Sequence, residues 1–306
     1  MYFLGVDGGG TRTTCVVADL YGNITARACG NSINYNSVGF IAARSNMRAI
    51  MKEIYAQMGT HCMFKCAFIG MSAISERASQ EETEAFATGV IDAAVVIMDS
   101  DVYIALAAMG TGFECAAAIS GTGSMVAGRN SQSAVIHTGG WGYILGDEGS
   151  GYKIALDALQ AAVRSHEGSC EPTALKEELY DFCGSDDMDG IIEAFYNPPM
   201  ERSAIAAFTP RVFKCADKGD GVALDIITAN AAALAQTSFA LLKDLPLCKA
   251  FGLWGGVFQH NELYRRIFTE LLHKQYPHIQ AELLSRPPEH GAVFAAIEEY
   301  KKRTEV

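Results

Sequence analysis

The sequence predicts an α/β fold of two related lobes, each a mixed sheet with flanking helices. Three observations support this prediction. Short apolar runs of strand length alternate with longer segments of helical periodicity. Glycine-rich turns follow two of the apolar runs, at Gly8 and at Gly121. Each turn lies between the first two strands of a predicted three-strand meander, so the meander is repeated, as in a fold built from two related halves.

The first lobe is predicted to cover residues 1–112. Apolar and β-branched runs bounded by turn residues predict its strands, and apolar residues at helical spacing predict its helices. The expected strands are 2–6, 13–20, 24–29, 67–71 and 94–98, and the expected helices are 38–58, 81–90 and 102–108. Three strands therefore come first, and helices then alternate with two further strands.

The second lobe is predicted to cover residues 113–288, where the strand pattern restarts and a mostly helical region follows. The expected strands are 115–119, 125–128, 134–137 and 250–254, and the expected helices are 152–163, 173–182, 191–196, 204–216, 222–242 and 262–275. A last helix, 289–302, is expected to pack back on the first lobe, so that residues 289–306 complete it.

Charge and composition exclude several classes of protein. The chain has 24 Lys and Arg against 35 Asp and Glu, a net charge of −11, whereas nucleic-acid binders show basic patches. The first residues contain no basic segment typical of a signal peptide. The longest mostly apolar stretch, Ile226–Leu242, contains polar residues and is shorter than the ~20 residues of a membrane span. Nine scattered cysteines without a C-x-x-C pair indicate reduced thiols, so we expect a cytoplasmic protein without a metal cluster.

Three glycine turns stand at predicted strand ends: Asp7–Thr11, Ser120–Ser124 and Gly255–Gly256. Glycines at such a place let several backbone N–H groups approach an oxyanion closely. Neither the G-x-G-x-x-G fingerprint nor the G-x-x-x-x-G-K-[ST] motif is present. The sequence therefore predicts phosphate-binding loops of a protein that is neither a Rossmann nor a P-loop protein.

These motifs carry a family resemblance. The segments 5–13 and 120–124 resemble the first and second phosphate loops of the actin/hexokinase/Hsp70 superfamily, and 254–257 resembles its adenosine loop. Within that superfamily, Gly139–Gly142 followed by Gly146–Ser150 is similar to the amino-sugar kinases of the BadF/BadG/BcrA/BcrD ATPase family. The resemblance extends nearly from end to end, with the motifs in the family's order. It implies two ribonuclease-H-like lobes of the actin-like ATPase type with a cleft between them.

The resemblance also implies ATP and Mg²⁺ as cofactors. Asp7 matches the loop acid that holds Mg²⁺ through water, whereas its local alternative is a turn-capping Asp. The residues that match contacts to the ATP phosphates or the adenosine are Gly8, Gly9, Gly10, Thr11, Thr122, Gly123, Ala206, Gly255 and Gly256.

Asp101 is the candidate catalytic base. It follows a predicted strand, at the end where ligands bind in such sheets, and it precedes the helix 102–108. Without the resemblance, an N-cap of that helix is the commoner role for an Asp at this place. Asp99 is its competitor, but Asp101 matches the family's catalytic Asp better through Leu106 and Ala107.

The sugar side is implied by the same resemblance. Besides Asp101, the residues that match sugar contacts are Asn34, Thr122, Gly140, Trp141, Gly142 and Asp147. For Asn34 the alternative is a polar loop residue, and for Trp141 it is packing at an interface between lobes. Glu148 is a further acid, in a supporting role or as a helix-start carboxylate. This chain has Asn36 where the eukaryotic amino-sugar kinases that it resembles have an aromatic residue, so it departs from the family pattern there.

The resemblance therefore implies an ATP-dependent kinase that phosphorylates the 6-hydroxyl of N-acetylglucosamine. Kinases of glucosamine or N-acetylmuramic acid are the nearest alternatives. A different class on this fold is the ATPase component that activates acyl-CoA reductases or dehydratases, which needs cysteines for an iron–sulfur cluster. A third class is a sugar-sensing regulator, which needs a basic DNA-binding segment. As partners we expect the amino sugar, ATP and a second copy in a homodimer, with no nucleic acid and no membrane.

Overall fold

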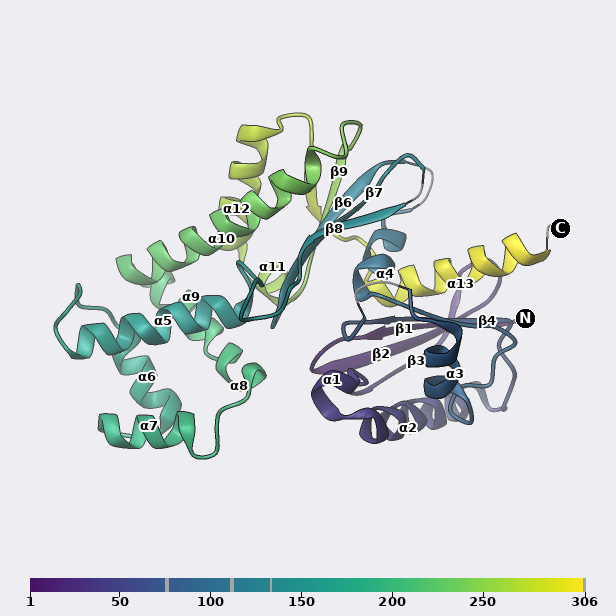
Figure 1. Cartoon of the computed structure of the whole chain (residues 1–306), viewed down its shortest axis with the longest axis horizontal. Helices are drawn as coiled ribbons and strands as arrows, with labels where there is room; N and C mark the ends of the chain where they lie inside the picture. Colours follow the sequence, from purple (N-terminus) through teal and green to yellow (C-terminus); the bar gives the residue numbers. More distant parts are fainter. Residues whose placement is uncertain (75–76, 111–112, 133, 305–306) are drawn as a thin grey trace. The chain divides into compact units, whose positions relative to one another are not determined.

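The structure is a computed structural model that describes residues 1–74, 77–110, 113–132 and 134–304. The chain divides into two compact units (Figure 1). The first unit consists of Met1–Phe113 together with Leu284–Val306, and the second of Glu114–Leu283. Each unit is built around its own five-stranded sheet. We describe them separately because each has its own core.

The sheet of the first unit has the order β3-β2-β1-β4-β5. Its strands are β1 (Phe3–Gly8), β2 (Arg12–Ala18), β3 (Ile24–Asn31), β4 (Cys66–Met71) and β5 (Val96–Asp99). The first three strands form an antiparallel meander, whereas β4 and β5 run parallel to β1. The mixed sheet that the sequence predicts is confirmed.

Helices cover both faces of this sheet. They are α1 (Tyr35–Val38), α2 (Phe40–Met58), α3 (Gln80–Ala87), α4 (Asp101–Ala108) and α13 (Pro288–Thr304). Because side chains alternate along a strand, Leu4 joins Met47 of α2 in one core, and Phe3 joins Val293 of α13 in another. Figure 1 shows α13, although it comes last in the chain, beside β1 and α4, which it contacts.

The sheet of the second unit has the order β10-β9-β6-β7-β8. Its strands are β6 (Cys115–Ser120), β7 (Ser124–Arg129), β8 (Val135–Gly139), β9 (Ala250–Trp254) and β10 (Gln280–Leu283). The meander β6-β7-β8 is antiparallel, and β9 and β10 continue in parallel from β6. The two sheets therefore share one topology, which confirms the predicted repeat. The sequence analysis missed β10, a four-residue edge strand without a buried residue.

The helices of the second unit pack with its sheet to form its core. They are α5 (Gly151–His166), α6 (Leu175–Cys183), α7 (Met188–Tyr196), α8 (Arg202–Ala206), α9 (Thr209–Asp217), α10 (Gly221–Leu242), α11 (Gly256–His260) and α12 (Glu262–Gln275). The predicted single helix over 204–216 is wrong, because the chain breaks between α8 and α9. Pro210 stands in the first turn of α9, where its missing N–H costs nothing, so it starts a new helix.

Helix α10 is the one helix, within the described part of the chain, that is long and apolar enough to cross a membrane. The sequence-based expectation of a stretch too short for this is wrong, since the helix begins at Gly221 and has 22 residues. It packs on α12, α9 and α5 and buries Asn230 and Ser238. These contacts are those of a core helix of the second unit.

Candidate functional site

Three neighbouring parallel strands of the first unit end at one edge of the sheet, and each end carries a polar side chain. Asp7 lies near the end of β1, Ser72 follows β4, and Asp101 follows β5 at the start of α4. The register places Asp7 beside Gly70 of β4, and Gly70 beside Asp99 of β5. In sheets of this kind the carboxyl ends of the strands form the ligand site.

The carboxyl groups at this edge influence one another. Burial, and then the neighbouring charges of Asp101 and Glu289, together raise the pKa of Asp7 to about 8. Glu289, from the first turn of α13, is 3% exposed and is paired with Arg27 at 3.1 Å. Asp7 is therefore a buried carboxyl group whose charged form is disfavoured by burial and by acidic neighbours.

Asp101 is not the N-cap of α4. The cap is Ser100, whose hydroxyl accepts a hydrogen bond from the Tyr103 N–H at 3.3 Å. The capping alternative for Asp101 is therefore wrong, because the preceding serine performs that function. Burial raises the pKa of Asp101 to about 6, and the backbone N–H groups of Val102 and of Asp101 itself offset part of this shift. Its carboxylate is left available for another role.

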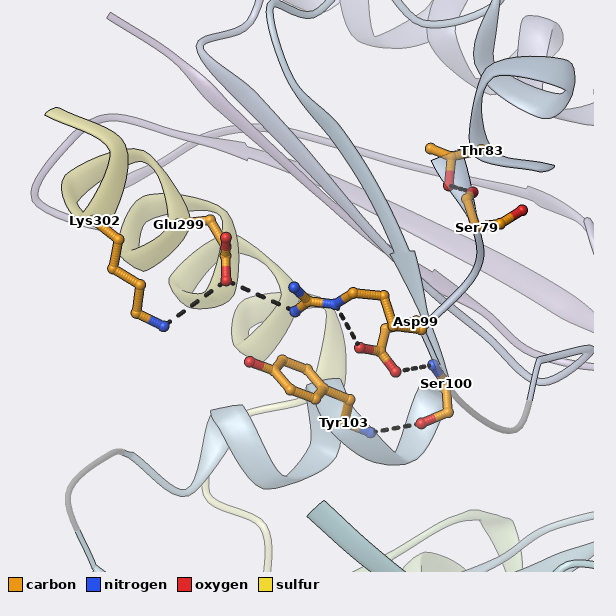
Figure 2. A network of polar contacts seen from close by, with 8 residues as sticks. Ser79, Thr83, Asp99, Ser100, Tyr103, Glu299 and Lys302 are labelled. Carbon is orange, nitrogen blue, oxygen red and sulfur yellow. Dashed lines mark hydrogen bonds and ion pairs between the residues drawn. The ribbon is translucent and has the colours of Figure 1, made fainter. Parts of the chain in front are cut away.

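Asp99, two residues earlier, has a different environment (Figure 2). It is 6% exposed, accepts a hydrogen bond from the Ser100 N–H at 2.8 Å and pairs with Arg77 at 3.2 Å. Arg77 also contacts Glu299 of α13 at 3.7 Å, and Glu299 contacts Lys302 at 3.8 Å. Asp99 thus belongs to a network that fastens β5 to α13.

Asn34 is the N-cap of the short helix α1. Its side-chain oxygen accepts from the N–H groups of Asn36 and Ser37, and its Nδ2 donates to the Ser72 hydroxyl at 2.9 Å. Ser72 in turn donates to the Gly8 carbonyl at 3.2 Å. The structure therefore links Asn34 to the first glycine loop through Ser72, which the sequence analysis missed because no local pattern marks it.

The first glycine loop follows β1. Gly8 is still part of the strand and pairs with Thr13, so the turn itself is Gly9–Thr11. A Cβ at Gly8 would lie 2.8 Å from the Ile33 side chain, whereas a Cβ at Gly10 would meet nothing within 4 Å. The Gly9 carbonyl accepts from the Ser32 hydroxyl at 2.9 Å. Gly8 is therefore required by packing, while Gly10 leaves the outside of the loop open.

The second glycine loop follows β6 in the second unit. Its Gly121 carbonyl accepts from the Gly151 N–H of α5 at 2.7 Å, and its Thr122 carbonyl accepts from the next N–H of that helix at 3.3 Å. A Cβ at Gly121 would meet nothing within 4 Å. The third glycine turn approaches the same place, since a Cβ at Gly255 would lie 2.2 Å from the Ser120 carbonyl oxygen.

Asp147 lies against the second glycine loop. It is 3% exposed and has a left-handed φ of +61°, the one positive φ outside glycine among the described residues. Burial raises the pKa of Asp147, whereas Arg202 and the Ser124 backbone N–H lower it. The Arg202 Nη2 lies 3.2 Å from the Asp147 Oδ2. Arg202 escaped the sequence analysis because 55 residues separate it from its partner.

The remaining predicted residues surround this loop to different degrees. Gly140 and Gly142 both have left-handed φ angles, of +74° and +83°, and Trp141 between them is 65% exposed, with its ring 5.5 Å from that of His137. Ala206 ends the short helix that Arg202 begins, and Gly256 begins α11. The structure thus places Asp147 against Gly123, and Gly255 against Ser120 at the start of the same loop.

The acids of the first unit suit Mg²⁺ held mainly through water. No group of three or more His, Cys, Asp or Glu that could hold a metal ion occurs in the part of the chain that the structure describes. Mg²⁺ does not need such a cage, because it is usually bound by one or two carboxylates, several waters and substrate phosphates. A cation beside Asp7 would stabilise the charged form of this carboxyl group, which burial and the neighbouring acids disfavour.

Comparison with known proteins identifies the family of the chain. The model of the BadF/BadG/BcrA/BcrD ATPase family matches residues 4–298. The chain is 28% identical over 302 residues to an N-acetylmuramic acid/N-acetylglucosamine kinase of Clostridium acetobutylicum, covering 96% of this chain and 98% of that protein. It is 26% identical over 314 residues to an N-acetyl-D-glucosamine kinase of Dictyostelium discoideum, with 98% of each covered.

A solved structure shows the same fold. The crystal structure of a protein from Chromobacterium violaceum, assigned as an N-acetylglucosamine kinase, superposes with a TM-score of 0.76. The match covers 97% of this chain and 98% of the other at 20% sequence identity. Together with the two sheets of equal topology, this confirms the predicted α/β, actin-like ATPase fold.

Proposed function

Since the chain belongs to the BadF/BadG/BcrA/BcrD ATPase family, we propose that it is an ATP-dependent amino-sugar kinase acting on the 6-hydroxyl of N-acetylglucosamine. Relatives named as amino-sugar kinases support the substrate class. The observation that carries the proposal is Asp101, a carboxyl group at a strand end that the helix cap does not use and whose pKa is about 6.

Asp101 is the catalytic base of the proposal. Phosphoryl transfer needs positioning, charge neutralisation and a carboxylate beside the attacking hydroxyl. A group with a pKa near 6 is mostly ionised at neutral pH and still accepts a proton readily, which is the range suited to general-base work. Asp99 is unsuited to this role because Arg77 already neutralises it.

ATP and Mg²⁺ complete the proposed chemistry. Gly8, Gly9, Gly10 and Thr11 in the first unit, and Thr122 and Gly123 in the second, bind phosphates through their backbone N–H groups. Ala206, Gly255 and Gly256 border the adenosine, and Asp7 holds Mg²⁺ through water. When bound, Mg²⁺ neutralises charge on the phosphate oxygens. The open space at Gly10 and Gly121 supports the phosphate assignment.

The proposed sugar contacts are those that the family resemblance implies. Asn34 keeps one Nδ2 hydrogen after its bond to Ser72, so it can still donate to a sugar hydroxyl. Asp147 accepts hydrogen bonds from hydroxyls. Trp141, between Gly140 and Gly142, supplies an exposed aromatic face for the sugar ring, and Thr122 is a further proposed contact. A cytoplasmic location and a homodimer belong to the same proposal.

A coupled ADP-release assay over a panel of sugars tests this function. We expect N-acetylglucosamine to stimulate ATP turnover far more than glucose or glycerol, with glucosamine and N-acetylmuramic acid included to define the N- and 3-O-substituents. Equal rates with glucose and glycerol would contradict an amino-sugar kinase. Iron bound to the purified protein, seen in its visible spectrum, would instead favour the activating ATPase class.

A further inference from the structure

The pair of Asp147 and Arg202 lies directly over the second glycine loop. Their oxygen and nitrogen atoms, Oδ2 and Nη2, are 3.2 Å apart. A Cβ at Gly123 would come within 2.3 Å of that nitrogen and 2.9 Å of that oxygen, so both groups contact the backbone of the loop. On its other side the guanidinium lies 5.6 Å from the centre of the Tyr143 ring. One cation therefore contacts both the proposed phosphate loop and the proposed sugar acceptor.

This pair is incompletely satisfied. The ion pair brings the Asp147 Oδ2 and the Arg202 Nη2 close together without a hydrogen bond between them. The Asp147 Oδ2 and the Arg202 Nε are buried, and neither has a hydrogen-bond partner among the residues that the structure describes. Few buried polar atoms in native proteins lack a hydrogen-bond partner, and each exception needs an explanation. The left-handed backbone of Asp147 adds to the cost of the arrangement. A ligand that offers either side chain better hydrogen bonds can therefore displace this ion pair.

A phosphate is such a partner for Arg202. Guanidinium groups bind phosphate oxygens through parallel charge-assisted hydrogen bonds, which are stronger than neutral ones. The Arg202 side chain is 35% exposed, whereas that of Asp147 is 5% exposed, so the arginine is the member with room to move. Moving it away from Gly123 would expose the Asp147 Oδ2 that it now covers.

We propose that Arg202 is an additional phosphate-binding residue of the second glycine loop and that it positions Asp147 for the sugar. Without nucleotide it occupies the acceptor oxygen of Asp147. When phosphates bind at Thr122 and Gly123, Arg202 turns to them, and Asp147 becomes free to accept a sugar hydroxyl. The inference rests on the proposed function. The exchange makes nucleotide and sugar bind cooperatively, because each ligand binds better when Arg202 and Asp147 are apart.

Calorimetry on the full chain tests this coupling. The affinity for N-acetylglucosamine is measured with and without Mg²⁺ and a non-hydrolysable ATP analogue, for the wild type and for Arg202→Gln. In the wild type we expect the nucleotide to tighten sugar binding by roughly 5- to 150-fold, the usual range of coupling between sites. In Arg202→Gln we expect a factor near one, tighter sugar binding than the wild type without nucleotide, and weaker nucleotide binding.

Arg211→Gln is the matched control, because Arg211 also pairs with a carboxylate of this unit, Glu178 at 2.6 Å. It should retain the full coupling. If Arg202→Gln does not fold, Arg202→Lys carries the test, since lysine keeps the charge but loses the fork of donors, and its coupling should fall between the two.

Two results would overturn the inference: coupling in Arg202→Gln equal to that of the wild type, or no coupling in the wild type. A wild type that binds the nucleotide but none of the amino sugars is a different result, which refutes the proposed function. In that case, comparing the nucleotide affinity of the wild type with that of Arg202→Gln still tests whether Arg202 binds phosphate.

Discussion

The two units share a sheet topology but differ in the partners of their candidate acids. In the first unit, burial raises the pKa of Asp7 to about 8 and that of Asp101 to about 6, and the charge of Asp101 adds to the shift of Asp7. In the second unit, burial also raises the pKa of Asp147, but Arg202 lies 3.2 Å away and opposes this shift. The same backbone framework thus carries an acidic edge in one unit and a neutralised pair in the other.

This difference shows how two units of the same topology can be suited to different functions. A carboxylate without a nearby cationic side chain is suited to binding a metal ion or accepting a proton. A carboxylate paired with an arginine can exchange that arginine for a ligand. The glycine loops, by contrast, are built in the same way in both units. One glycine of each loop packs against protein, at Gly8 and Gly123, and another faces open space, at Gly10 and Gly121. Three experiments can break or sharpen this comparison.

The largest effect is expected from Asp101→Asn, which removes the uncompensated charge and the proton acceptor of the first unit. General-base contributions are typically about 10²–10⁴-fold, so kcat should fall by roughly that factor while nucleotide binding persists. Steady-state kinetics with calorimetry of the nucleotide complex measures both quantities.

Asp99→Asn is the control for this variant. It breaks the ion pair with Arg77 and should lower the unfolding temperature, but the folded protein should keep most of its turnover. An inactive Asp99→Asn beside an active Asp101→Asn would place the base two residues earlier. If both variants remain active, positioning by the phosphate loops has to account for the reaction.

An intermediate effect is expected from alanine at the two open glycines. Gly10→Ala and Gly121→Ala should keep the wild-type unfolding temperature, because the added Cβ meets no protein atom within 4 Å. It would enter the space assigned to the phosphates. Overpacking costs about 1–3 kcal/mol, so we expect the Kd for nucleotide to rise by roughly 5- to 150-fold.

Gly8→Ala and Gly123→Ala are the matched opposites, since their Cβ atoms would meet Ile33 and the Asp147–Arg202 pair. Gly8→Ala should lose stability as well as affinity in thermal unfolding, because Ile33 is fully buried. Gly123→Ala should lose less stability, because the Arg202 side chain can move away. Wild-type nucleotide affinity in both Gly10→Ala and Gly121→Ala would reduce the two loops to ordinary hairpins.

The smallest effect is expected in the pH dependence of stability. The folded protein holds the Asp101 proton up to a pKa of about 6, above the ordinary value near 4, so its stability falls as the pH rises between the two. Asn does not titrate. Asp101→Asn should therefore match the wild type at pH 4 and exceed its unfolding temperature by a few degrees at pH 7.

Arg202→Gln should show the opposite sign. It leaves the Asp147 carboxylate buried without its cation, so the loss of unfolding temperature should be larger at pH 7 than at pH 4, where that carboxyl is protonated. Parallel pH profiles for the two variants would contradict the contrast between the units.

The sequence by itself determined the repeated meander, the glycine loops and the candidate acids at the strand ends. These features are local: periodicity fixes which residues form strands, and glycine marks the turns between them. The same reasoning placed Asp101 correctly at the start of α4. It missed β10, because an exposed four-residue strand has no buried apolar pattern to mark it.

Only the tertiary structure decided what each acid does. Ser100, and not Asp101, caps α4; Arg77 neutralises Asp99; and Arg202 covers Asp147. The last two partners stand 22 and 55 residues away in the sequence. Whether a carboxylate is compensated depends on the burial and charges that folding brings around it, and no pattern within one segment reports side chains that arrive from another.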